Sequence, residues 1–394
     1  MNQPDKQNFE DELKALLEGI SAPSSDEIPP APESEKVPLI FPQPVQHVKK
    51  KKSKLQKALL ILSTVLLSFV ILLGCTFSVF YYSGSLQMFG GYDDVIIQPP
   101  TIAQVDDVDD DGKTITYKGE RYTFNDDVTS ILCIGVDKEE LGTESGVIGT
   151  AGQADAIYLL TIDNQNKRYN VISISRDTIT DIETYSASGK FMGTEQTQLC
   201  LSYAYGDGFA LSAENTVTAV SRLLYNVPIN TYFAMDMDAI SVLNDLVGGV
   251  TVPEYDENGN PTGKNITLHG DAAQTYVRRR NLAQIDSNNA RMQRQINYLK
   301  AFSTKCIEAT KADLNVPLDI FNAAAEYCST SLTASKITYI TTNVFSNNKD
   351  IDLSFLSVPG EVVKGEDGFA EFYADETQLL ELVLDVFYIK QPSQ

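Results

Sequence analysis

The feature that most constrains this chain is an uncharged stretch of 25 residues from Ala58 to Tyr82. At 1.5 Å per helical residue, the stretch is long enough to cross a hydrocarbon core of about 30 Å with some tilt. It also lacks the polar face that a helix covering a soluble core shows. A cleaved signal peptide is the competing interpretation, but its apolar stretch is about 7–15 residues long and lies nearer the start of a chain. We therefore predict a transmembrane helix over residues 58–82.

The residues that flank this stretch predict its orientation. Six lysines precede it, at positions 49–52, 54 and 57, and Tyr81 and Tyr82 close its other end as an interfacial aromatic pair. Lysine-rich flanks stay in the cytoplasm. We therefore expect a single-pass protein of the cell membrane, with a cytoplasmic N-terminus and residues 83–394 outside.

The charge is distributed unevenly along the chain. The 394 residues carry 31 Lys and Arg against 53 Asp and Glu, a net charge of -22. Residues 1–57 hold nine of each sign, so 22 basic and 44 acidic residues remain after residue 82. Binding of nucleic acid through bulk charge needs an excess of Lys and Arg, so we expect no nucleic-acid partner.

Composition divides the chain further. Residues 1–57, rich in Pro, Ser and Glu, predict a mostly disordered cytoplasmic tail because they cannot bury enough apolar surface to offset the entropy of ordering. Residues 83–127 are expected to form an extracytoplasmic stalk, and residues 128–390 a catalytic domain.

Hydrophobic patterns predict the fold of that domain. Short, nearly continuous apolar runs predict strands covered on both faces at Ser130–Val136, Ala156–Ile162 and Tyr169–Ile174. Three- and four-residue spacing of apolar side chains predicts helices at Asn215–Leu224, Met237–Leu246, Gly270–Arg279, Arg291–Thr310, Leu318–Tyr327 and Glu376–Phe387. Strands interleaved with helices indicate the α/β class, here an α/β/α sandwich with a central mixed sheet.

Two kinds of site are disfavoured by the residue inventory. The chain has two histidines, His47 and His269, and no G-x-S-x-G motif, so a Ser-His-Asp hydrolase or a histidine-ligated zinc site is not expected. The cysteines after the membrane stretch show no metal-binding spacing, and either disulfides or buried free thiols fit them; they are Cys133, Cys200, Cys306 and Cys328.

Arginines are concentrated in one segment of an otherwise acidic region. Residues 278–294 hold five arginines and a single acid, Asp286; the arginines are Arg278, Arg279, Arg280, Arg291 and Arg294. Guanidinium groups bind phosphate and carboxylate in a bidentate fork, which predicts a pocket for such a ligand. Some of these arginines could instead cover helix surfaces, and Arg279 and Arg294 fit either role.

Charged residues also stand at predicted strand ends. Asp137 follows the first predicted strand, Asp155 precedes the second, and Arg176 and Asp177 follow the third. Two carboxylates together with substrate phosphates suit magnesium, which keeps few protein ligands. A turn-forming role for the aspartates is the alternative.

These motifs together resemble the LytR-CpsA-Psr family of membrane-anchored enzymes. The matching stretches are ILCIGVD (131–137), GQADAIYLLTID (152–163), VISISRDT (171–178), AYGDG (204–208), LVGGVTV (246–252), LHGDAAQTYVRRR (268–280), ARMQRQINYLKAF (290–302) and SVPGE (357–361). Each motif is loose by itself, but the ordered set over residues 130–387 is specific.

The resemblance implies an activity and its residues. Family members transfer a glycopolymer of the wall teichoic acid or capsular polysaccharide type from a polyprenyl-pyrophosphate carrier to peptidoglycan. Carried over by position, Asp137 and Asp155 would hold Mg²⁺. The pyrophosphate would be bound by Arg176, Arg278, Arg280, Arg291 and Gln295. Arg176, Arg278 and Arg280 would also act in catalysis, and the acceptor hydroxyl would lose its proton to Asp155 or Asp177.

Three positions depart from the family pattern. Gln153 stands where the family usually has an arginine, Ser175 replaces a common proline, and Asn288 replaces an aspartate. The loss of a positive charge at Gln153 predicts a weaker transferase.

Other functions remain open. One alternative is a relative that binds polyprenyl-linked glycans without transferring them. The other is a membrane-bound regulator that signals through the tail. Hydrolysis of the pyrophosphate with water as acceptor is a variant of the enzyme.

Overall fold

A computed structural model describes residues 54–89, 105–108, 113–138, 141, 148–256, 260–279, 287–346 and 350–392. The expected cytoplasmic tail covers residues 1–57, of which residues 54–57 belong to a helix that begins at Lys54. Residues 1–53 lie outside the described ranges, so their predicted disorder stays a prediction. The chain divides into two units, residues 1–64 and 65–394, and the second unit holds all the strands and every described helix that follows the membrane stretch.

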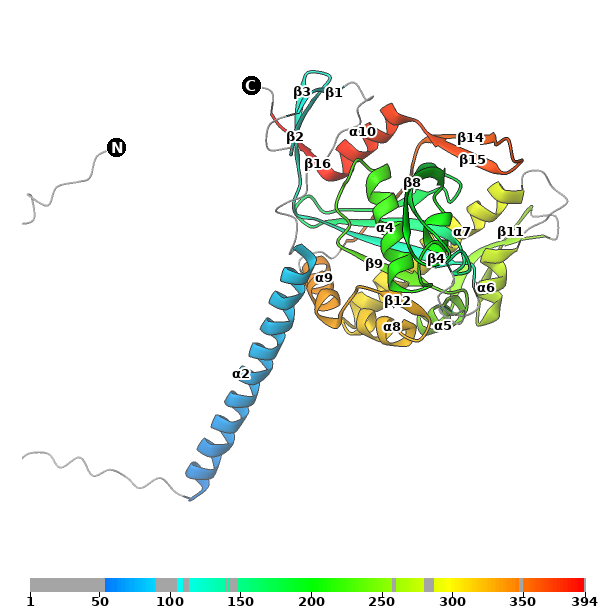
Figure 1. Ribbon diagram of the computed structural model, residues 1–394. Coiled ribbons are helices and arrows are strands. Elements are labelled where there is room, and N and C mark those ends of the chain that lie inside the picture. Colours follow the sequence, from blue (N-terminus) through cyan, green and yellow to red (C-terminus); the bar gives the residue numbers. More distant parts are fainter. Residues whose placement is uncertain are drawn as a thin grey trace, which may run out of the picture. The chain divides into compact units, whose positions relative to one another are not determined.

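A mixed sheet forms the centre of the structure (Figure 1). Its strand order in the described residues is β12-β9-β4-β5-β6-β13, with β4–β9 and β6–β13 parallel and the other pairs antiparallel. The strands are β4 (Val128–Val136), β5 (Ala154–Asp163), β6 (Arg168–Ile174), β9 (Thr231–Met235), β12 (Cys328–Thr330) and β13 (Leu353–Ser357). Each of the three predicted strands is confirmed, extended by one to three residues.

Helices cover both faces of this sheet because successive strand side chains point to opposite sides. On one face, Leu132 and its neighbours in β5 and β6 pack against α4 (Ala210–Leu223) and α10 (Glu376–Phe387). On the other, Ile131 packs with Val344 of α9 (Ala334–Ser346). The arrangement confirms the predicted α/β/α sandwich with a mixed sheet.

A second hydrophobic cluster lies beside the sheet and supports the arginine-rich segment. It joins the hairpin of β10 (Val250–Tyr255) and β11 (Pro261–Leu268) to α6 (Asp271–Arg278) and α7 (Ser287–Ala312). The helix α5 (Ala239–Leu246) packs between this cluster and α8 (Val316–Ala324). All six predicted soluble helices are present, with ends that differ by up to five residues.

Smaller elements complete the domain. The remaining elements are β7 (Ile179–Tyr185), β8 (Phe191–Gln198), α3 (Leu201–Ala204), β14 (Gly360–Lys364), β15 (Ala370–Ala374) and β16 (Tyr388–Lys390), together with β1 (Val105–Val108), β2 (Thr114–Tyr117) and β3 (Glu120–Phe124). Strand β16 pairs with β3, so part of the segment predicted as a stalk belongs to a sheet closed by the C-terminal strand.

The predicted membrane helix is α2 (Lys54–Phe89), which continues seven residues past Tyr82. Within the described residues, the segment Ser63–Phe89 is the one helix long and apolar enough to cross a membrane. Its last turns contact α9: the Tyr81 hydroxyl donates to Asn343 Oδ1 at 3.0 Å, and Tyr81 and Tyr339 have ring centroids 5.2 Å apart. The end of the helix is therefore part of the folded domain.

We expect Gly84→Ala to destabilise the protein. A Cβ at this position would overlap the Ser335 carbonyl oxygen and lie 2.8 Å from Cβ of Tyr339, so α2 would have to move from α9. Overpacking of this kind costs about 1–3 kcal/mol. The check is the thermal unfolding midpoint of the detergent-solubilised full chain.

The matched control is Gly74→Ala in the same helix, where an added Cβ meets no atom within 4 Å. We expect this control to leave the midpoint unchanged or to raise it, because alanine favours a helix over glycine. Equal midpoints for the two variants would contradict the close contact at Gly84.

Candidate active site

The register of three strands brings the predicted aspartates and arginine to one edge of the sheet. Strand β4 runs toward this edge, antiparallel β5 runs away from it, and β6 returns to it. The Asp137 N–H donates to the Gln153 carbonyl at 3.2 Å, which continues the β4–β5 pairing past an irregularity at Gly135 and Val136. Asp137, Asp155 and Arg176 therefore lie at neighbouring strand ends, as the sequence predicted.

Asp155 is the centre of a cluster of ion pairs. Its Oδ1 accepts a short hydrogen bond from Nη1 of Arg176, and its Oδ2 lies 3.9 Å from Nη1 of Arg291. Nε of Arg176 lies 3.4 Å from Oδ1 of Asp177, and Nη2 of Arg278 lies 3.9 Å from Oδ1 of Asp137. Residues from β5, the turn after β6, α6 and α7 thus converge on one place.

Burial strengthens the central pair. The side chains of Arg176 and Asp155 are 27% and 19% exposed, so water screens their attraction only in part. Burial by itself lowers the pKa of Arg176, but the charges of Asp155 and Asp177 outweigh it and the pKa is raised. The guanidinium therefore stays positive at every pH at which the protein is folded.

Two further side chains position the arginines. Nε2 of Gln295 donates to the Val277 carbonyl at 3.4 Å, at the end of α6 that carries Arg278. Arg294 is buried, donates to the Arg279 carbonyl and places its guanidinium 5.6 Å from the ring centre of Tyr255. Arg294 thus fixes the end of α6, while the side chain of Arg279 is exposed.

Two hydrogen bonds hold the turn after β6 in shape. Ser175 Oγ accepts from the Asp177 N–H at 3.3 Å, and the Thr178 hydroxyl donates to the Ser175 carbonyl at 2.7 Å. These bonds hold Arg176 and Asp177 on a compact turn. Ser175 therefore shapes this turn through its side chain, which the proline common in the family could not do.

Comparisons with known proteins show to which family the chain belongs. Residues 100–384 match the LytR_cpsA_psr family. The chain belongs to this LytR-CpsA-Psr family. A polyisoprenyl-teichoic acid–peptidoglycan teichoic acid transferase, TagU, from Bacillus cereus is 30% identical over 254 residues, which is 63% of this chain and 74% of that protein. The TagU of Bacillus anthracis is 28% identical over 265 residues, which is 66% of this chain and 77% of that protein.

A solved structure shares the fold. A protein of Streptococcus agalactiae superposes with a TM-score of 0.53 at 20% identity, covering 66% of this chain and 86% of that chain. At this identity the likeness shows that the two chains share a fold and nothing finer.

Some predicted site residues of this LytR-CpsA-Psr chain lie outside the described residues. These are Arg280 and Asp286, and nothing is described of the side chain of Asn288. The structure brings the other predicted site residues to one region, but their roles stay predictions; they are Asp137, Asp155, Arg176, Asp177, Arg278, Arg291 and Gln295.

The donor set fits magnesium on chemical grounds. Among the described residues, no group of three or more His, Cys, Asp or Glu side chains could hold a metal ion. Asp137 and Asp155 are two carboxylates that lie beside arginines, which suits a metal that takes its other ligands from water and substrate. Because both oxygens of Asp155 face arginines, a metal there would compete with Arg176 and Arg291.

The backbone of Cys200, to which no sequence pattern pointed, joins the parts of the site. Its N–H donates to the Arg176 carbonyl at 2.9 Å, and its carbonyl accepts from the Ala154 N–H at 3.1 Å. All five cysteines are free thiols in the structure rather than disulfides. Cys200 is buried, whereas Cys133, Cys306 and Cys328 are only partly buried.

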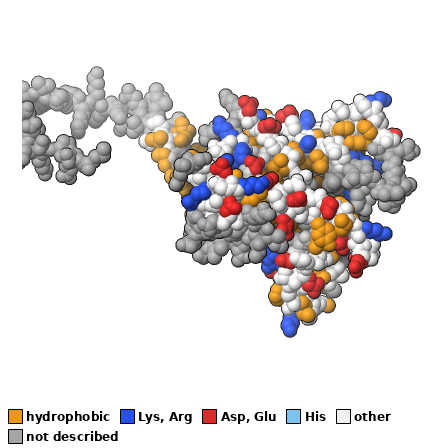
Figure 2. All heavy atoms as spheres, turned by 90° about the horizontal axis from the view of Figure 1, so that it is seen from above, with side chains coloured by type: hydrophobic (Ala, Val, Ile, Leu, Met, Phe, Trp, Pro, Cys, Tyr) orange, Lys and Arg blue, Asp and Glu red, His pale blue; other side chains and the backbone are white. Residues whose placement is uncertain are grey.

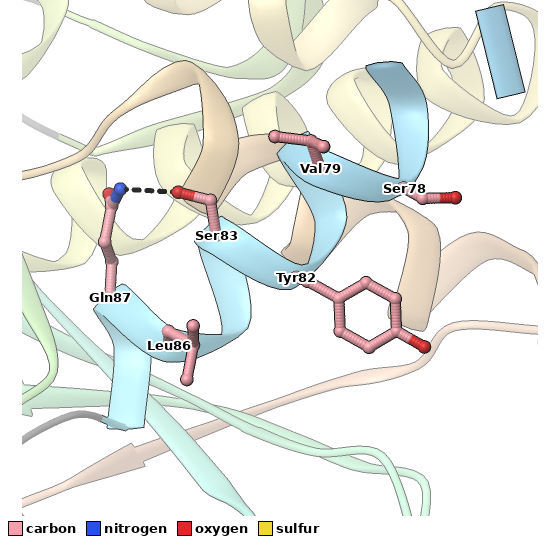
Figure 3. A pocket seen from close by; sticks show the side chains of 6 residues that line it. All are labelled: Ser78, Val79, Tyr82, Ser83, Leu86 and Gln87. Atoms are coloured by element: carbon pink, nitrogen blue, oxygen red, sulfur yellow. Dashed lines mark hydrogen bonds between the residues drawn. The ribbon is translucent and has the colours of Figure 1, made fainter. Parts of the chain in front are cut away.

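Other parts of the described surface differ from the cluster in their chemistry. On the face in Figure 2, Lys and Arg side chains of the described residues are interspersed with Asp and Glu and form no continuous basic area. A hollow of about 510 Å³ lies on α2 and is lined by Ser78, Val79, Tyr82, Ser83, Leu86 and Gln87 (Figure 3). These residues carry no charge, so this hollow is no candidate for phosphate chemistry.

We expect Cys200 to resist alkylation in the native protein. Its side chain is 2% exposed, and burial raises the pKa of its thiol to about 11, so little thiolate exists at a pH of about 8. Mass spectrometry of peptides after iodoacetamide treatment measures this directly. The same treatment in guanidinium chloride should label Cys200 fully, and rapid labelling of the native protein would contradict its burial.

Proposed function

We propose that this chain is a membrane-anchored phosphotransferase that attaches an anionic glycopolymer from a polyprenyl-pyrophosphate carrier to peptidoglycan. The observation that carries the proposal is the convergence of Arg176, Arg278 and Arg291 on the carboxylates of Asp137 and Asp155 at the sheet edge. The TagU relatives, named as teichoic acid transferases, supply the polymer class and the acceptor. The apolar helix α2 supplies the anchor.

Location follows from the same proposal. The lysines before the apolar stretch favour a cytoplasmic N-terminus, which supports an extracytoplasmic position for the domain, on the side where peptidoglycan lies. A carrier lipid in the same membrane would then present its pyrophosphate to the domain.

The transfer requires charge neutralisation more than covalent chemistry. The acceptor hydroxyl oxygen forms a bond to the phosphorus that carries the glycan, and the bond from this phosphorus to the bridging oxygen breaks. Polyprenyl phosphate leaves, and negative charge grows on the leaving oxygen. Arg176, Arg278 and Arg291 offer guanidinium groups to this charge in a partly buried site, where electrostatic stabilisation is effective.

A bound Mg²⁺ ion would add two positive charges to those of the arginines. Held by Asp137 and Asp155, it would neutralise the phosphate oxygens and orient them. If Asp155 serves the metal, then Asp177 is left to accept the proton of the acceptor hydroxyl. The turn after β6 holds Asp177 beside Arg176, with Oδ1 of Asp177 3.4 Å from Nε of Arg176, which supports this role. Hydrolysis of the pyrophosphate is the side reaction expected when water takes the acceptor's place.

We expect Arg176→Gln to lower kcat by about 10²–10³-fold, the loss typical of removing one donor that stabilises transition-state charge. Arg176→Lys should recover part of this loss, because lysine keeps the charge but not the fork. The assay uses the full chain in detergent with a polyprenyl-pyrophosphate glycan and a peptidoglycan oligomer, and mass spectrometry of the phosphodiester product.

The matched control is Arg222→Gln. Arg222 pairs with Glu183 at 2.9 Å and is 32% exposed, close to the 27% of Arg176, but its partner belongs to β7 rather than to the cluster. We expect this control to keep the wild-type rate. If the wild-type protein binds the donor but forms no product, its function is binding alone and not transfer.

We expect chelation of magnesium to abolish transfer, and Asp137→Asn to raise the Mg²⁺ concentration needed for half-maximal rate. The reason is that an amide oxygen is a weaker ligand than a carboxylate. The measurement is the initial rate as a function of Mg²⁺ concentration. An unchanged rate in excess chelator would show that the arginines act without a metal.

A further inference from the structure

A hairpin formed by β14 and β15 is attached to the turn after β6 and leads into α10 (Figure 1). The Phe372 N–H donates to the Asp177 carbonyl at 2.8 Å, and Phe372 also forms a parallel bridge with Thr178. In addition, Nε2 of Gln198 donates to the Ala370 carbonyl at 2.6 Å. Strand β15 is therefore held by hydrogen bonds beside the turn that carries the charged residues of the candidate site.

The register divides this hairpin into two faces, because successive strand side chains point to opposite sides. Phe372 lies on the inner face and packs against the hydrophobic core. On the other face, Tyr373 lies opposite Glu361. Val363 lies opposite Glu371 on that same face. We call this second face, which does not carry Phe372, the outer face of the hairpin.

The outer face exposes two aromatic rings. The Gly365 N–H donates to the Phe369 carbonyl at 2.8 Å, which continues the register, and Phe369 is four residues from Tyr373 and so shares its face. Phe369 is 67% exposed, Tyr373 is 46% exposed, and Val363 is 38% exposed. Four residues of strand span about 14 Å, so the two rings together can contact more than one ring of a ligand. Adjacent exposed apolar side chains of this kind mark an interaction surface.

The charges of the hairpin indicate which kind of partner it fits. Residues 360–374 carry one base, Lys364, and four acids. The acids are Glu361, Glu366, Asp367 and Glu371. They repel a phosphate-rich polymer or an anionic lipid surface. A neutral chain of sugars meets no such repulsion: its hydroxyls can donate to carboxylates, and its C–H faces can pack on aromatic rings.

We propose that the outer face of this hairpin binds the glycan backbone of the peptidoglycan acceptor, with Phe369 and Tyr373 stacking on its sugar rings. The inference rests on the transferase function proposed above and adds the surface on which the acceptor lies. Bonded strands lie about 4.8 Å apart, so the bond from Phe372 to the Asp177 carbonyl keeps a bound glycan near the carboxylate proposed to accept the proton of the acceptor hydroxyl.

The chain contains no tryptophan, which allows a binding test that needs no activity. Phe369→Trp keeps an aromatic ring and introduces a single fluorophore. The emission of the full chain in lipid nanodiscs is followed during titration with a short, neutral N-acetylglucosamine oligomer and, separately, with poly(glycerol phosphate). Phe191→Trp is the matched control. Phe191 is 52% exposed, but it pairs with Tyr185 at the end of the β7–β8 hairpin that lies away from Ile179.

We expect the neutral oligomer to move the emission of the Phe369→Trp variant to shorter wavelength in a saturable manner, because a stacked sugar excludes water from the indole ring. The oligomer should leave the emission of the Phe191→Trp variant unchanged. Poly(glycerol phosphate) should change the emission of neither variant.

In the transfer assay, Phe369→Ala and Tyr373→Ala should each raise the KM for peptidoglycan about three- to tenfold, the loss expected for one aromatic stacking contact. The kcat at saturating acceptor and the KM for the lipid donor should stay unchanged, because neither ring touches the reacting atoms. Tyr373→Phe should keep the wild-type KM, since it retains the ring and loses only the hydrogen bond to Glu371. Phe191→Ala should change none of these constants.

Three results would overturn the inference. A response of Phe369→Trp to poly(glycerol phosphate) instead of the neutral oligomer would make the hairpin a surface for the anionic polymer. Quenching of its emission by nitroxide-labelled lipids in the nanodisc would place the hairpin on the membrane. An unchanged KM for peptidoglycan in both alanine variants would remove the hairpin from acceptor binding. If the wild-type protein forms no product, the proposed transferase fails, while a saturable response confined to Phe369→Trp still supports a glycan-binding hairpin.

Discussion

The hydrogen-bonded register of β4, β5 and β6 is the constraint on which the rest of the structure depends. A shift by one residue would turn every side chain of a strand to the other face. The buried side chains of Leu132, Leu159 and Ile172 make such a shift costly, because each is 1% exposed or less. The same register sets Asp155 opposite the turn that carries Arg176. The hydrophobic core thus determines the geometry of the charged edge, even though none of its residues contributes a charge.

The ion pairs at this edge of the sheet bring together arginines that suit an anionic substrate. In the structure, Arg176 and Arg291 face the two oxygens of Asp155, and Arg278 faces Asp137. Arg176 and Arg291, which are partly buried, are each paired with a carboxylate, because an unpaired buried charge would be costly. In the proposed transferase, Asp137 and Asp155 would hold the metal, and the arginines would bind the phosphates. Gln295 and Arg294 bind carbonyl groups at the end of α6 and so connect α6 to α7.

The membrane helix and the domain are also connected physically. The end of α2 contacts α9 through Tyr81 and Gly84, and α9 packs on the sheet face opposite α4. Strand β16 pairs with β3 and so joins the C-terminal strand to the segment that comes after α2. In the proposed transferase, such contacts would limit the positions that the domain can adopt relative to a lipid-linked donor.

The sequence by itself determined the local features of this protein. The uncharged stretch before Tyr82, the apolar strand runs and the helical periodicity of Glu376–Phe387 depend on near neighbours in the chain, so pattern and composition were enough. The ordered motifs also located Asp137, Asp155 and Arg176. Tertiary structure decided which groups meet: the pairing of Arg291 with Asp155, the structural role of Arg294, the joining function of the Cys200 backbone and the attachment of the β14–β15 hairpin to the turn at Asp177. These depend on contacts between residues far apart in the chain, and no local pattern encodes which distant side chains the packing of the core will bring together.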